Sequence, residues 1–210
     1  MRGLSLLVVA GALFGVPAPS VAQLIGPENA PLPLVVQAAP VAVTKLESFR
    51  PEPGAIMTIG HEIVGGIRRG SAVVEVRDVR DSRGNSAGGL TILLVAATTR
   101  IERMFLDVDE IPGVLKSLDA LLKYTANPTP FKKFEARFVT RGNLSFVAYA
   151  NATGNIEYAL QVDEVPQNTL SNIDSADMLR IRELIEQGLQ KLQMAGYSAG
   201  PPPAPSRNSR

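Results

Sequence analysis

Apolar and charged residues alternate along residues 71–80, which is the period of a strand with one buried and one exposed face. The polar, glycine-rich run over residues 81–89 has the composition of a reversing loop. Residues 90–97 are almost entirely apolar and predict a central strand buried on both faces. Residues 101–108 predict the next strand, and residues 55–63 predict a strand ahead of them all.

The apolar spacing changes from two residues to that of a helix at Ile111. Val114, Leu118 and Leu121 continue a stripe at i, i+3, i+7 and i+10, which predicts an amphipathic helix that covers a sheet. The acidic residues 109–110 stand just ahead of a proline, where the positive end of a helix dipole favours them. The prolines at 128 and 130 end the helix near residue 124.

The same order of elements then returns. Residues 131–140, 144–150 and 156–162 predict three strands, and after a loop Asp174 caps the longest helix. A repeat of element order at about fifty residues suggests a duplicated β-β-β-α unit. The predicted fold class is therefore α+β. It consists of two β-β-β(-β)-α units with antiparallel sheets, each covered by one amphipathic helix, packed as one domain over residues 55–195, with halves at 55–126 and 127–195.

The two ends of the chain differ in composition from this domain. Residues 1–22 have the basic start, short apolar core and small residues of a cleaved secretory signal, and the apolar run is shorter than the ~20 residues of a membrane span. Residues 23–54 are proline-rich and predict an arm or linker, and residues 196–210 predict a disordered tail. We expect an exported protein, periplasmic or secreted, with no transmembrane segment after signal cleavage. The absence of cysteine excludes disulfides.

Few residues offer chemistry. His61 is the only histidine, and the adjacent Glu62 points to the opposite face of a strand, so the two cannot share a proton relay. Asp78, Asp81 and Asn85 could offer oxygen ligands, but their spacing does not match a calcium-binding loop. The sequence therefore predicts no catalytic residue, no metal site and no cofactor. A hydrolase that uses carboxylates such as Asp78 or Asp81 stays as an alternative.

Basic residues on or beside the predicted strands, with phenylalanines and tyrosines nearby, have the composition of a single-strand-binding sheet. In element order the chain resembles the whirly-type and positive-cofactor-type single-stranded DNA-binding fold, over residues 55–194. In that fold two such units present strands to nucleic acid while their helices pack together in the middle. The resemblance implies a binding surface formed by Arg77, Arg80, Lys133, Arg137 and Arg141.

Charge and compartment favour a different partner. Without Arg2, Arg207 and Arg210, which lie in the predicted signal and tail, 18 basic residues face 20 acidic ones, so no acidic partner is required. We expect a non-catalytic binding or assembly module whose partner is an envelope or extracellular protein. Residues 32–43 are a candidate for strand addition to that partner. Single-stranded nucleic-acid binding is the alternative that the fold resemblance implies.

Overall fold

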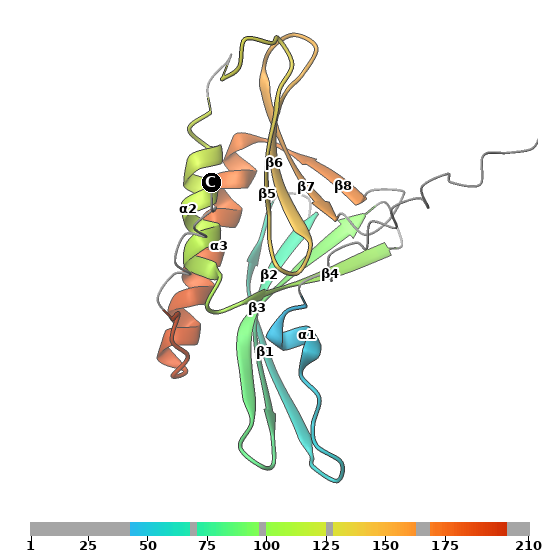
Figure 1. Ribbon diagram of the computed structural model, residues 1–210, viewed down its shortest axis with the longest axis vertical. Coiled ribbons are helices and arrows are strands. Elements are labelled where there is room, and N and C mark those ends of the chain that lie inside the picture. The colour runs from blue at the N-terminus through green and yellow to red at the C-terminus, as the bar shows by residue number, and fades with distance from the viewer. Residues whose placement is uncertain (1–42, 68–70, 97–99, 125–127, 163–168, 201–210) are drawn as a thin grey trace, which may run out of the picture. The chain divides into compact units, whose positions relative to one another are not determined.

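The computed structural model describes residues 43–67, 71–96, 100–124, 128–162 and 169–200. It contains two four-stranded antiparallel sheets, and the strands of each lie in chain order (Figure 1). Sheet A consists of β1 (Met57–Gly66), β2 (Ala72–Asp81), β3 (Ser86–Ala96) and β4 (Arg100–Asp107). Sheet B consists of β5 (Glu135–Val139), β6 (Leu144–Ala150), β7 (Ile156–Val162) and β8 (Thr169–Ile173). The predicted α+β class with two strand-rich units is confirmed.

Two differences from the predicted strands have physical reasons. β3 begins at Ser86, inside the run expected to be a loop, and it includes Gly89, where a Cβ atom would overlap the carbonyl oxygen of Leu106 on β4. The glycine therefore allows close approach of two strands and does not form a turn. β8 occupies part of a segment expected to be a loop, because five residues without a strong apolar alternation still pair with β7.

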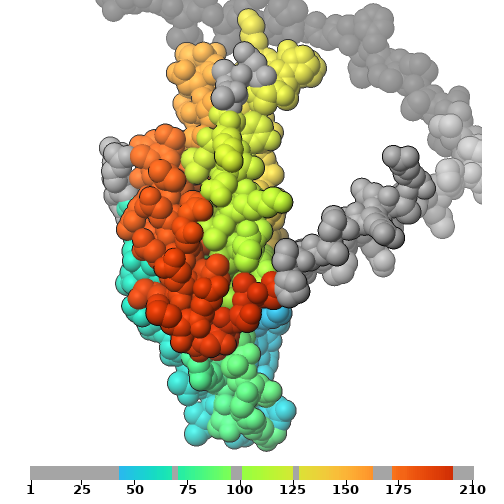
Figure 2. Space-filling view, turned by 90° about the vertical axis from the view of Figure 1, so that its left-hand side faces the viewer, coloured from blue at the N-terminus to red at the C-terminus, as the bar shows by residue number. Residues whose placement is uncertain are grey.

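The two long helices pack against each other, and each covers the sheet that the other follows (Figure 2). α2 (Ile111–Leu121) follows sheet A in the chain but contacts β5 and β6 of sheet B. α3 (Ser175–Met194) follows sheet B but contacts β1, β2 and β3 of sheet A, in addition to β7. The covering helix expected for each sheet is present, and it comes from the other half of the sequence.

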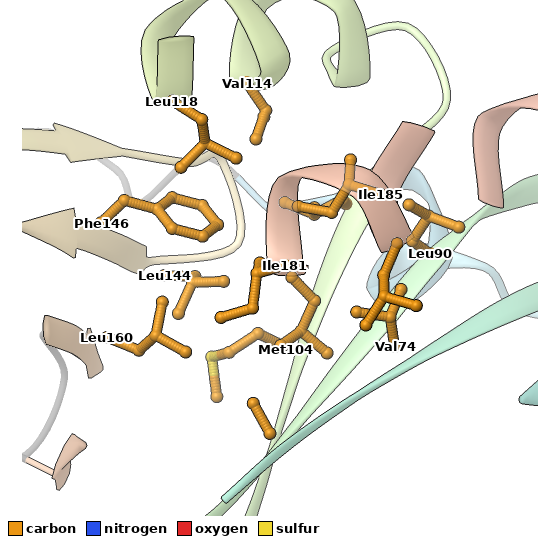
Figure 3. Close-up of a cluster of buried hydrophobic side chains, with 14 of the residues drawn as sticks. Val74, Leu90, Met104, Val114, Leu118, Leu144, Phe146, Leu160, Ile181 and Ile185 are labelled. Atoms are coloured by element: carbon orange, nitrogen blue, oxygen red, sulfur yellow. The ribbon is translucent and has the colours of Figure 1, made fainter. Parts of the chain in front are cut away.

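Both sheets and both helices share one hydrophobic core. Ile181 of α3 is fully buried and lies between Leu144 of sheet B and Met104 of sheet A (Figure 3). On the α2 side, Leu118 lies close to Phe146 of β6 (Figure 3). Burial of side chains from both sheets and both long helices in one cluster stabilises these elements together, since apolar area removed from water contributes about 25 cal/mol per Å².

The described ends of the predicted arm and tail also pack on this domain. α1 (Lys45–Ser48) is a single turn with a capping box formed by Thr44 and Glu47, and Leu46 is buried. At the other end, Tyr197 packs on the main core, and its hydroxyl donates a hydrogen bond to Asp78. The predicted signal, residues 23–42 of the arm and residues 201–210 of the tail lie outside the described residues.

Among the helices that the structure describes, none has the length and apolar composition needed to cross a membrane.

Candidate binding surface

Each sheet has one face under the helices and one face turned away from them. On β2, Val74 and Val76 belong to or pack against the main core, while Glu75, Arg77 and Val79 alternate with them and point the other way. The register carries this alternation to β4, where Arg103 and Phe105 share the outer face with Arg77. α1 covers one part of this face, where Leu46 packs with Val79 and Ala87. The rest of the outer face of sheet A is the candidate binding surface.

β1 forms one edge of sheet A and is exposed along most of its ten residues. Met57, Ile59 and Ile63 keep 42%, 40% and 63% of their surface exposed, although all three are large and apolar. A long edge strand with exposed apolar side chains is a template for pairing with another strand. Its usefulness as a template depends on which backbone groups are free.

The pairing of β1 with β2 identifies those groups. Ser82 donates its amide to the carbonyl oxygen of Ile56 at 2.9 Å, so Ile56 directs its backbone groups toward the neighbouring strand. In an antiparallel pair this direction alternates, and Thr58, Gly60 and Glu62 therefore also bond to β2. The amides and carbonyls of the intervening residues point to the open edge. These residues are Met57, Ile59, His61 and Ile63.

A register shift between Ile63 and Gly65 ends this arrangement. Beyond it, Ile67 donates its amide to the carbonyl oxygen of Ala72 at 3.1 Å, so odd-numbered residues now face β2. Bulges of this kind limit the length over which an edge can pair. Among the described residues, the free edge therefore spans residues 57–63, and its free amides belong to the residues whose side chains lie on the outer face.

Two pockets adjoin this edge on the outer face of sheet A. A basic pocket of about 310 Å³ is lined by Ile59, His61, Glu75, Arg77 and Arg103. The Arg77 guanidinium lies 5.5 Å from the centre of the Phe105 ring, and the Nδ1 atom of His61 lies 3.7 Å from Glu75. Glu75 is 8% exposed, so a carboxylate lies at the floor of the pocket.

An apolar pocket of about 290 Å³ lies beside it, under α1. It shares Ile59 and Arg77 with the basic pocket. Its other lining residues are Leu46, Glu47, Phe49, Arg50, Met57, Val79 and Phe105. Together the two pockets offer a cation next to apolar side chains, at the strand edge that has free amides.

The outer face of sheet B is different because its charged groups already bond to one another. A pocket of about 360 Å³ lies there, and Arg137 within it pairs with Glu135 at 2.7 Å. The Tyr149 hydroxyl donates to Glu157 at 2.9 Å. Burial, followed by this hydrogen bond, raises the pKa of Tyr149, so the ring stays neutral. This face offers a ligand fewer free charges.

The five basic residues predicted to form one surface lie in separate places. Arg77 lines the basic pocket, whereas Arg80 lies at the far end of β2 and pairs with Asp78 at 2.8 Å. Lys133 is exposed ahead of β5, and Arg137 lies on the outer face of sheet B. Arg141 belongs to a polar junction between the two halves of the sequence. The residues expected from the resemblance therefore do not converge.

The junction around Arg141 is structural. Asp107, fully buried at the end of β4, accepts a hydrogen bond from the Arg141 guanidinium at 2.8 Å and from the Lys45 amide at 2.8 Å. Burial acts to raise the pKa of Asp109, but its bonds to Lys45 and Arg141 outweigh burial and lower it. Burial raises the pKa of Glu110, which accepts the amides of Asp107 and Arg141. These bonds hold α1, β4 and the β5–β6 turn together.

The other carboxylates singled out in the sequence form local contacts. Asp81 accepts the side-chain amide of Asn85 at 2.7 Å and the backbone amide of Arg83 at 2.9 Å, and the Asn85 bond is the main cause of its lowered pKa. Asp78 pairs with Arg80 and accepts the Tyr197 hydroxyl. Across the described ranges, no group of three His, Asp or Glu side chains gathers as a metal ion would need.

Sequence reasoning missed Arg103, Phe105 and the free edge of β1. The alternation of residues 101, 103 and 105 places these side chains on one face, but it does not show that the face is left open. Comparison with known proteins adds no assignment: no protein-family model and no curated protein matches the chain.

The junction predicts unequal effects for two neighbouring aspartates. Asp107→Asn removes a buried charge that Arg141 and the start of α1 require, and we expect a loss of about 3 kcal/mol in the free energy of unfolding. Asp109→Asn is the matched control, because Asp109 pairs with the same arginine at 3.4 Å but is partly exposed, and its loss stays below about 1 kcal/mol. Urea unfolding of both variants measures the difference. Equal losses in the free energy of unfolding would contradict the structural role assigned to Asp107 at this junction.

Proposed function

We propose that the protein is a non-catalytic binding module that adds an extended segment of a partner protein to the free edge of β1. The observation that carries this proposal is that the free amides belong to residues 57, 59, 61 and 63, and that three of these residues, Met57, Ile59 and Ile63, expose large apolar side chains. Strand addition derives affinity from main-chain hydrogen bonds and specificity from pockets for alternate side chains. Both elements are present along residues 57–63, where two pockets adjoin the edge.

Charge supports a protein partner over nucleic acid. Binding to phosphates needs several arginines or lysines on one surface. Of the five basic residues considered for that role, Arg80, Arg137 and Arg141 are engaged with carboxylates. Besides Arg77, the two pockets on the outer face of sheet A are lined by Arg103, by the single histidine and by Arg50, whose guanidinium already bonds to backbone carbonyls. Two arginines around a buried glutamate favour recognition of a small acidic group over a polyanion.

The proposal also places the protein outside the cytoplasm, on the basis of residues 1–22. An exported binding module without cysteine depends on its core for stability, and one core that joins both sheets is suited to that requirement.

Export predicts a defined mature start. Intact-mass analysis of protein recovered from the exported fraction of expressing cells should give a species that begins at Gln23, because the small residues ahead of it suit signal cleavage. Full-length protein found only in the cytoplasmic fraction would contradict export and leave the binding surface to be tested against cytoplasmic partners.

Strand addition predicts that a proline on the open edge blocks binding while the sheet stays intact. The probes are peptides selected from a phage-displayed random library on the mature chain. Ile59→Pro removes an amide that points away from β2, and we expect the selected peptides to bind at least tenfold more weakly, a difference of about 1.4 kcal/mol. Calorimetric titration measures the affinity, and thermal unfolding shows whether the fold is retained.

Ile59→Thr is the matched control, because it shortens the same side chain and keeps the amide. We expect it to weaken binding less than Ile59→Pro does. Equal effects of the two substitutions would mean that only the side chain matters, and a library that yields no binding peptide would contradict the proposed function itself.

A further inference from the structure

The basic pocket beside β1 holds two arginines that have no acidic partner. Among the arginines whose side chains the structure describes, Arg77 and Arg103 alone form neither an ion pair nor a hydrogen bond. The remaining ones bond to carboxylates or to backbone carbonyls. These residues are Arg50, Arg80, Arg83, Arg137, Arg141, Arg180 and Arg182. Both unpaired arginines line the same pocket, Arg77 from β2 and Arg103 from β4.

Glu75 does not neutralise this pair. Its partner within ion-pair distance is His61, at 3.7 Å, and neither guanidinium reaches it to that distance. Two arginines outnumber the one carboxylate that lines the pocket. A planar guanidinium with unused donors is suited to a carboxylate, which it can bind through two parallel hydrogen bonds.

The apolar pocket lies beside the basic pocket, displaced by two residues along β1 toward its N-terminal end. Met57 and Ile59 line the apolar pocket, and Ile59 and His61 line the basic pocket. Outer-face positions on a strand follow every second residue, roughly 7 Å apart. A strand added at this edge has the same spacing on its own outer face, so side chains two residues apart on it meet the two pockets.

We propose that the edge of β1 recognises an extended peptide in which an aspartate or glutamate stands two residues from a large apolar side chain. The carboxylate binds Arg77 and Arg103, and the apolar side chain enters the pocket under α1. This inference rests on the proposed strand addition and names the segment that the partner supplies. The Arg77 guanidinium also lies over the Phe105 ring, and this contact limits its movement between the two pockets that it lines.

The test uses three acetylated and amidated heptapeptides. Their sequences are TLTETLT, TLTQTLT and TLTKTLT, which read the same in both directions, so a leucine stands two residues from the central residue whichever way the strand adds. We expect the glutamate peptide to bind the mature chain at least tenfold more tightly than the glutamine peptide in low-salt calorimetric titration. The lysine peptide binds most weakly, since it places a cation against two others.

Variants of the two arginines test whether the basic pocket causes the preference for the glutamate peptide. Arg103→Gln and the double variant Arg77→Gln/Arg103→Gln should reduce the preference for glutamate to less than about threefold, while the glutamine peptide binds as before. Arg80→Gln is the matched control: it removes an arginine from the same strand as Arg77 that already pairs with Asp78, and it should leave the preference unchanged. Thermal unfolding confirms that each variant is folded.

The outcomes separate this inference from the proposed function. If the glutamate and glutamine peptides bind equally, the acidic specificity is overturned while strand addition stands. If the preference survives in the double variant, the pocket assignment is overturned. Two further probes test other ligands. If N-acetylglutamate amide binds as tightly as the glutamate peptide, the ligand is a small acid and the peptide proposal is overturned. It is also overturned if oligothymidylate binds more tightly than the glutamate peptide and this binding depends on Arg77 and Arg103.

Discussion

The exchange of covering helices is the constraint on which the rest of the structure depends. α2 follows sheet A and covers sheet B, and α3 follows sheet B and contacts three strands of sheet A. Each sheet is therefore covered largely by a helix from the other half of the sequence, and residues such as Ile181 and Met104 belong to one core. Because both long helices lie against each other on the inner faces, the outer faces have only the single turn of α1 as a helical cover among the described residues.

The open edge follows from the same arrangement. α3 reaches the inner face of β1, where Lys191 pairs with Glu62 at 2.7 Å, but β1 remains the end of the sheet. The pleat then places free amides and outer-face side chains on the same residues, up to the bulge at Ile63. Ile63 and Met57 leave apolar surface exposed in the isolated chain, and fully burying such a side chain is worth roughly 1.5–3 kcal/mol. A partner strand would recover part of that free energy.

Most of the fold could be predicted from the sequence, because periodicity reports which residues share a face. The alternation over residues 71–80 and the helical stripe from Ile111 gave elements close to those observed. Periodicity does not say which helix covers which sheet, and the exchange of α2 and α3 was therefore not predictable. β8 was missed because its pairing with β7 depends on the neighbouring strand more than on its own composition.

The candidate surface was less predictable than the fold. Arg77 was identified as a basic strand residue, but the sequence could not separate it from Arg141, whose carboxylate partners Asp107 and Asp109 lie more than thirty positions away. Whether an arginine is free depends on such long-range pairs. The free edge of β1 was not predictable for a similar reason, because the register with β2 determines which amides are free.

Amide hydrogen exchange along β1 tests the central claim most directly. In the protein without added peptide, NMR should show slow exchange at Thr58, Gly60 and Glu62, whose amides bond to β2, and fast exchange at Ile59 and His61. Addition of a binding peptide should then slow exchange at Ile59 and His61 selectively. Equal protection of all five amides in the free chain would show that the edge is already occupied, and would contradict the account of β1 as an acceptor for a partner strand.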